Sequence, residues 1–163
     1  MDRFRLGIVG LGRHGERYAR HLLQGEVEGA ALAGVCRRDP AFGERFARAN
    51  GVPYFADARA LAASPDIDGV IVVTPTKAHR AVALEILAAG KPVLIEKPLA
   101  ESEAAAAEIA QAAGRAGLAC MVAHTMRREV LYRDLARRIA AQAGPVGIDY
   151  VYVLDGRGDA VLR

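Results

Sequence analysis

The sequence predicts an α/β protein with a doubly wound, parallel β-sheet. Three observations indicate this fold class. Short apolar segments alternate strictly with segments of helical spacing as far as Val122, which is typical of parallel strands joined by right-handed helical crossovers. A glycine-rich turn, Gly10 to Gly15, separates the first apolar segment from the first helical one. The segment Gly69 to Val73 contains V-I-V-V with no polar residue, as in strands that are buried on both faces.

We expect six strands, because six short apolar runs are bounded by glycine, proline or polar turn residues. The expected strands are Arg5–Val9, Ala30–Cys36, Pro53–Phe55, Gly69–Val73, Pro92–Ile95 and Leu118–Val122.

Five helices are expected between these strands. They cover Gly12–Leu23, Asp39–Ala49, Ala58–Ala63, Lys77–Ala89 and Ser102–Ala116. Asp39, Asp57 and Ser102 precede helical segments and are residue types that cap helix N-termini. Gly90 and Gly117 follow helical segments and are expected to end them.

The character of the chain changes after Val122. Arg127 to Gln142 is expected to form one helix, because its apolar residues Val130, Leu131, Leu135 and Ile139 are spaced for one face. A turn at residues 144–147 and a strand at Ile148–Leu154 follow. A lone strand is poorly stabilised, so we expect this one to pair with an edge of the sheet, with another copy, or with a further domain.

Composition excludes several classes of protein. The formal net charge is +3, and the arginines occur in isolated pairs, so the sequence does not predict nucleic-acid binding. No apolar run approaches the roughly 20 residues that span a membrane, and the N-terminus lacks a signal-peptide core. Cys36 and Cys120 are expected to be small buried residues in a reducing cytoplasm, and no cluster has metal-ligand spacing.

The turn Gly10-Leu11-Gly12-Arg13-His14-Gly15 has the G-x-G-x-x-G spacing that binds a dinucleotide pyrophosphate between a strand and a helix. Gly10 permits the sharp turn, Gly12 lets the backbone approach the pyrophosphate, and Gly15 lets the helix pack closely on the strand. The helix start adds unpaired N–H groups and a partial positive charge. Glycine turns also join many strands to helices with no ligand, so the motif alone leaves a purely structural role open.

Ligands of an open parallel sheet bind beyond the carboxyl ends of its strands. The segments that follow the first, second, fourth, fifth and sixth strands should therefore lie along one edge. These segments are the glycine turn, Arg37-Arg38-Asp39, Thr74-Pro75-Thr76, Glu96-Lys97-Pro98 and His124-Thr125.

Arg37 stands where dinucleotide-binding folds often carry an acid for the ribose 2′-hydroxyl. An arginine cannot accept that hydrogen, but it can pair with a 2′-phosphate. We therefore expect NADP(H) to be preferred, with NAD(H) possible. The alternative is that Arg37 points to solvent while Asp39 caps the next helix.

Lys97 is the strongest candidate for proton exchange with a substrate hydroxyl, with Glu96 beside it to orient the lysine. The alternative is a surface lysine in a loop, which is the commoner case for an arbitrary lysine, and the position at the carboxyl edge narrows the difference between the two interpretations. His79 lies in the first turn of a helix, where a histidine is more often structural than catalytic. No serine or cysteine has an obvious base partner, so nucleophilic catalysis is not expected.

Together these segments resemble the N-terminal, NAD(P)-binding Rossmann domain of the glucose–fructose oxidoreductase / inositol dehydrogenase / MocA family. The similar runs are L-G-I-V-G-L-G-R-H-G (Leu6–Gly15), V-C-R-R-D-P (Val35–Pro40), V-V-T-P-T-K-A-H (Val72–His79) and A-A-G-K-P-V-L-I-E-K-P-L-A (Ala88–Ala100). The resemblance covers about residues 4 to 127, and the E-K-P run is its most specific part.

The resemblance implies that Lys97 is the catalytic or substrate-positioning residue and that Thr74, Pro75 and His79 lie near the nicotinamide. It implies a dinucleotide-binding domain at residues 1–125. Residues 126–163 would then be a connecting helix and the first strand of a substrate and dimerisation domain. Three positions depart from the family pattern: Arg37 replaces an acid, Thr76 an asparagine and Arg128 an aromatic residue.

The expected cofactor-binding residues come from the turns at the carboxyl edge and from the crossing into the second part of the chain. They are Gly10, Gly12, Arg13, His14, Gly15, Arg37, Arg38, Thr74, Pro75, Glu96, Lys97 and Arg127. The expected catalytic residues are Lys97, Glu96 and His79.

Two functions from different classes follow. The first is an NAD(P)-dependent oxidoreductase that acts on a sugar-like or polyol hydroxyl. The second is a nucleotide-binding module without turnover that senses the cofactor or joins a partner chain. A two-domain reductase of the dihydrodipicolinate-reductase type is disfavoured by the E-K-P run. We also expect association into a homo-oligomer, or with a partner chain, through the strand Ile148–Leu154.

Overall fold

A computed structural model of the chain describes residues 3–125, 129–141, 152–154 and 160–162. The chain forms two compact units, Met1–His124 and Thr125–Arg163, and each is considered by itself.

The first unit contains a six-stranded sheet whose neighbouring strands all pair in parallel. Its strands are β1 (Phe4–Val9), β2 (Ala30–Cys36), β3 (Tyr54–Phe55), β4 (Gly69–Val72), β5 (Val93–Ile95) and β6 (Cys120–Val122). Their order across the sheet is β3-β2-β1-β4-β5-β6, which is the doubly wound Rossmann topology. The predicted fold class is therefore confirmed, and the expected strand and helix limits agree with the observed ones to within two residues.

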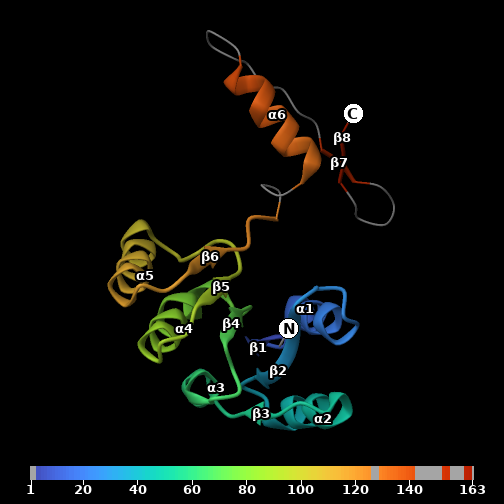
Figure 1. Ribbon diagram of the computed structural model, residues 1–163, viewed down its shortest axis with the longest axis vertical. Helices are drawn as coiled ribbons and strands as arrows, with labels where there is room; N and C mark the ends of the chain where they lie inside the picture. The colour runs from blue at the N-terminus through green and yellow to red at the C-terminus, as the bar shows by residue number, and fades with distance from the viewer. Residues whose placement is uncertain (1–2, 126–128, 142–151, 155–159, 163) are drawn as a thin grey trace. The chain divides into compact units, whose positions relative to one another are not determined.

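Helices cover both faces of the sheet (Figure 1). On one face lie α1 (Arg13–Leu23) and α2 (Pro40–Asn50). On the other lie α3 (Ala58–Ala63), α4 (Thr76–Ala88) and α5 (Glu103–Ala116).

The strands contribute side chains to the apolar clusters on both faces of the sheet, because successive side chains of a strand point to opposite faces. Ile71 packs in the cluster with α1 and α2, whereas its neighbours Val70 and Val72 pack in the cluster with α3, α4 and α5. All four residues of β4 are buried, as the unbroken apolar run predicted.

The helix limits follow the capping residues expected from the sequence. Asp39, Asp57 and Ser102 each accept a hydrogen bond from a backbone N–H in the first turn of α2, α3 and α5, respectively. Gly117 ends α5 in the left-handed conformation, with φ of +64°. These contacts satisfy helix-end groups that would otherwise lack partners.

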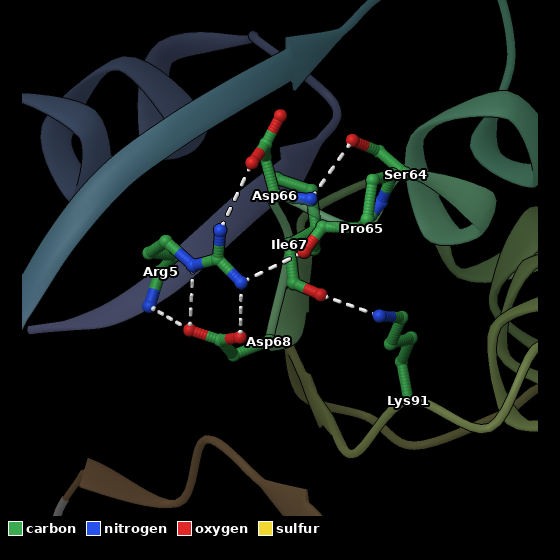
Figure 2. A network of polar contacts seen from close by, with 7 residues as sticks. All are labelled: Arg5, Ser64, Pro65, Asp66, Ile67, Asp68 and Lys91. Carbon is green, nitrogen blue, oxygen red and sulfur yellow. Dashed lines mark hydrogen bonds and ion pairs between the residues drawn. The ribbon is translucent and has the colours of Figure 1, made fainter.

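A polar network joins the start of β1 to the loop before β4, at the amino edge of the sheet (Figure 2). The Arg5 side chain donates to both carboxylate oxygens of Asp68, at 3.0 and 2.8 Å, and to Asp66 at 3.0 Å. Lys91 Nζ donates to the carbonyl of Ile67 at 2.6 Å. The Arg5 hydrogen bonds lower the pKa of Asp68 to about 2.

The described part of the second unit contains α6 (Val130–Ala140) and two strands, β7 (Tyr152–Leu154) and β8 (Ala160–Leu162). β7 and β8 pair antiparallel. The partners expected for the strand ending at Leu154, an edge of the sheet, another copy or a further domain, did not include β8, because no strand was predicted at Ala160–Leu162. The expected turn at residues 144–147 lies outside the described residues. None of the described helices is long and apolar enough to cross a membrane.

Replacing Asp68 should destabilise the fold more than replacing Asp66, because the Asp68 side chain is 32% exposed and that of Asp66 78% exposed. The pKa of Asp68 is lowered in the folded state, so its carboxylate contributes stability above pH ~4, and this contribution is lost as the pH falls towards 2. Urea denaturation of wild type and Asp68→Asn should therefore show a gap in the free energy of unfolding at pH 7 that narrows below pH ~4. A constant gap, or an equal effect of Asp66→Asn, would contradict this assignment.

Candidate functional site

The turns after β1, β2, β3, β4 and β5 surround one cleft of about 920 Å³ at the carboxyl edge of the sheet. Most of the residues selected from the sequence line this cleft. They are Gly10, Gly12, Arg13, His14, Arg37, Arg38, Thr74, Pro75, Glu96 and Lys97. Gly15 and His79 lie outside the lining, and Arg127 lies outside the described residues.

The glycine turn has backbone packing that only glycine permits at two positions. Gly10 has φ of +104°, and a Cβ there would lie 2.7 Å from the backbone of Val73. A Cβ on Gly15 would lie 1.8 Å from the carbonyl oxygen of Gly10. Gly15 is thus buried beneath the turn, where it lets α1 pack directly against the end of β1.

Gly12 differs from these two glycines. A Cβ there would meet nothing within 4 Å, so the space in front of it is open to the cleft. Gly12 is the N-cap of α1 and provides no side-chain hydrogen bond to the helix start. The first N–H groups of this 11-residue helix therefore lie at the cleft, and so does the positive end of the helix dipole. Open space beside such donors is what an anionic group requires.

Arg37 links the turn after β2 to the glycine turn. Its guanidinium donates to the carbonyl of Leu11 and lies 3.9 Å from the centre of the Phe42 ring. Tyr54 Oη donates to the Arg37 carbonyl at 3.0 Å. Arg37 is therefore held at the cleft by its neighbours on both sides, whereas Arg38 beside it is exposed.

The acids and the cations around the cleft differ in whether they have partners within the protein. The cations are Arg13, Arg37, Arg38, Lys77 and Lys97, and the acids are Asp39, Asp57, Glu85 and Glu96. Asp39 and Asp57 act as helix caps. None of the five cations forms an ion pair with a described carboxylate. Cations without carboxylate partners in a cleft create a positive potential that attracts an anion.

Glu96 is fixed by two hydrogen bonds. Tyr18 Oη donates to its Oε1 at 2.8 Å, and the backbone N–H of Lys97 donates to its Oε2 at 3.0 Å. Burial, together with the hydrogen bond to Glu96, raises the pKa of Tyr18 to about 12. Glu96 was expected to orient the lysine; in the structure it bonds the backbone of Lys97, whose side chain is exposed.

His79 does not lie at the cleft surface, which corrects the expectation that it acts there directly. Its side chain is buried, Nδ1 lies 2.9 Å from the carbonyl of Pro98, and Nε2 lies 2.8 Å from the carbonyl of Thr74. Since both ring nitrogens already face backbone acceptors, His79 joins the turn after β4 to the turn after β5.

The hydroxyl of Thr74 is buried without a hydrogen-bond partner among the described residues. The residue lines the cleft. Buried hydroxyls in proteins normally have a partner. A ligand with a donor or an acceptor at this point would satisfy it.

Sequence reasoning missed one wall of the cleft. Ala56, Asp57 and Ala58 line it after β3, as do residues of α4 such as Val82 and Glu85. The survey of segments that follow strands omitted the third strand, and the same rule would have found Asp57. Tyr18 was also missed, because its spacing fits an ordinary apolar helix face.

Cys36 lines the cleft as an uncharged group. Burial raises the pKa of its thiol to about 11, so the thiol stays protonated near neutral pH. Cys36 and Cys120 are both free. Within the described ranges, no three His, Cys, Asp or Glu side chains gather as a metal site would require.

Comparisons with known proteins agree with this geometry. Residues 4–124 match the family described as "Oxidoreductase family, NAD-binding Rossmann fold" (GFO_IDH_MocA). Scyllo-inositol 2-dehydrogenase (NAD(+)) of Bacillus subtilis is 36% identical over 155 residues, which cover 91% of this chain and 43% of that protein. The chain thus spans less than half the length of this curated relative.

Solved structures similar to the chain include the following two. An NAD-binding oxidoreductase from Klebsiella pneumoniae is 33% identical with a TM-score of 0.76, over 85% of this chain and 38% of that one. Scyllo-inositol dehydrogenase from Lactobacillus casei, with bound NAD(H) and scyllo-inositol, is 27% identical with a TM-score of 0.78, over 85% of this chain and 41% of that one.

The same substitution should have opposite effects at two positions of the glycine turn. Gly15→Ser should lower the free energy of unfolding by at least ~2 kcal/mol, because its Cβ meets the Gly10 carbonyl. Gly12→Ser should leave it unchanged or raise it by up to ~1 kcal/mol, because the space is open and serine is a good N-cap. Chemical denaturation of both variants measures the difference, and equal effects would contradict the packing described.

Proposed function

The chain belongs to the GFO_IDH_MocA oxidoreductase family, which has an NAD-binding Rossmann fold. On this premise we propose that it is the cofactor-binding portion of a dehydrogenase. The substrate of this dehydrogenase would be a polyol or a similar sugar-like hydroxyl. The substrate class is suggested by relatives named as inositol dehydrogenases. The observation that carries the proposal is that Lys97 lines the same cleft as the glycine turn.

The residues around the cleft fit a dinucleotide. The open space at Gly12 beside the start of α1 suits a pyrophosphate, and the unpartnered hydroxyl of Thr74 suits a polar group farther along. Strand order places β2, β1, β4 and β5 side by side. We therefore assign Arg37 to the adenosine end, Gly12 to the pyrophosphate, and Thr74 and Lys97 to the nicotinamide end.

NADP(H) is the proposed preference, with NAD(H) as the alternative. Arg37 retains guanidinium N–H groups beyond the one that binds Leu11, and Arg38 next to it is exposed. Asp39, which follows Arg38 in the chain, accepts the Phe42 N–H at 3.2 Å as a helix cap. Arg37 and Arg38 thus offer two cations to a 2′-phosphate, and the two acids that line the same end, Asp39 and Asp57, both cap helices.

Lys97 is proposed to exchange the proton of the substrate hydroxyl. A bound nicotinamide ring would supply the hydride acceptor or donor. Neutral Lys97 takes the proton from the hydroxyl in oxidation, and protonated Lys97 returns it in reduction. Glu96 holds the Lys97 backbone, and His79 holds the turn that follows, so both act on the reaction through position.

Two expectations from the sequence stay predictions. One is association with another copy or a partner chain through the strand that ends at Leu154, although its pairing with β8 removes the original reason for it. The other is location in the cytoplasm.

Cofactor preference can be measured by calorimetry. Wild type should bind NADPH at least tenfold more tightly than NADH, and Arg37→Ala should reduce this ratio about tenfold or more, because a charge-assisted contact is lost. Arg48→Ala, on the same side of the sheet but outside the cleft lining, should leave the ratio unchanged. Tighter binding of NADH by wild type would end the NADP(H) proposal.

Replacing Lys97 should affect turnover much more than cofactor binding. Lys97→Ala should lower turnover of an inositol by about 10²-fold or more, while the cofactor dissociation constant changes less than threefold. Lys97→Arg should be equally slow, because arginine keeps the charge but does not release its proton. Cofactor binding by wild type without turnover of any polyol would favour the nucleotide-binding module instead.

A further inference from the structure

Tyr18 connects the two ends of the proposed site. It lies in α1, the helix whose first turn borders the open space at Gly12. Its ring packs against the apolar cluster beneath α1 and α2, while its hydroxyl reaches Glu96 Oε1 at 2.8 Å. One helix therefore carries donors for the pyrophosphate at its start and a donor for the turn after β5 farther along.

The hydrogen bond from Tyr18 fixes the peptide that carries Lys97. Glu96 Oε2 accepts the Lys97 N–H at 3.0 Å, and the Glu96 N–H donates to the Val72 carbonyl at 2.9 Å. With one carboxylate oxygen held by Tyr18 and the other by Lys97, the Glu96 side chain has no freedom to swing away from the turn. Tyr18 remains a donor throughout the neutral range, because its pKa is raised to about 12.

We propose that Tyr18 is a positioning residue: through Glu96 it sets the backbone of Lys97, and hence the place of the lysine ammonium, relative to a dinucleotide held at the start of the same helix. The inference rests on the proposed function, since it needs a nicotinamide end at Lys97. A merely structural tyrosine would act through its ring, which fills apolar space, and the hydroxyl would make no difference to ligand binding.

Tyr54 provides a matched control. Its hydroxyl also holds a turn at the carboxyl edge, by donating to the Arg37 carbonyl at 3.0 Å. That turn follows β2 and lies at the proposed adenosine end. Tyr18→Phe and Tyr54→Phe thus each remove a hydroxyl that supports a turn, at opposite ends of the cleft, while keeping the aromatic ring.

The test compares two ligands that differ only in the nicotinamide: NADPH and 2′-phospho-ADP-ribose, with NADH and ADP-ribose as the pair if wild type prefers NADH. Tyr18→Phe should weaken NADPH binding about two- to threefold and leave 2′-phospho-ADP-ribose binding unchanged, because the turn that loses its hydrogen bond lies only at the nicotinamide end, where Lys97→Ala itself changes the cofactor dissociation constant less than threefold. Tyr54→Phe should leave the ratio of the two affinities as in wild type. An unchanged ratio in Tyr18→Phe, or an equal loss of both ligands, overturns the inference.

A second readout needs no ligand. In Tyr18→Phe the backbone amide of Lys97 should exchange its hydrogen at least fivefold faster, while amides in β1 keep wild-type rates. Unchanged exchange at Lys97 also overturns the inference. If Tyr18→Phe does not fold, Glu96→Ala, which keeps Tyr18 and removes the acceptor of its hydroxyl, should change the affinity ratio in the same direction, and an unchanged ratio counts against the proposal. Failure of the proposed function would be seen separately, as absence of dinucleotide binding by wild type.

Discussion

Close packing of backbone against backbone at the first turn is the constraint on which the rest of the molecule depends. The end of β1, the segment after β4 and the first turn of α1 meet at Gly10 and Gly15 with no Cβ between them. A side chain at either glycine would push α1 away from the sheet. Since α1 carries both the open helix start and Tyr18, the same packing that completes the fold also sets the dimensions of the cleft.

Charged residues at one edge of the sheet stabilise the fold, whereas those at the other edge are available to a ligand. At the amino edge, Arg5 is matched by Asp66 and Asp68, and Lys91 by a backbone carbonyl. At the carboxyl edge, Asp39 and Asp57 cap helices, Glu96 holds the Lys97 turn, and the cations have no described carboxylate partner. Charge that is neutralised internally contributes to the fold, whereas charge left without a partner is available to an anionic ligand.

Much of the candidate site could be predicted, because in a parallel sheet the segment after each strand must lie at one edge. This rule predicts that the glycine turn, Arg37, Thr74 and Lys97 lie together, and in the structure they line one cleft. It could not say which side chains reach the ligand and which support it. The family resemblance groups His79 with the catalytic residues, yet its ring is buried between two carbonyls.

The sequence by itself determined the strands, the helices and the glycine turn of the first unit, because apolar periodicity, capping residues and glycine conformation act over a few neighbouring residues. The tertiary structure alone decided the pairing of Tyr18 with Glu96, which stand 78 residues apart. It also decided the burial of His79 and the partner of β7. Such contacts depend on which strands and helices become neighbours in space, and no local pattern in the chain records that choice.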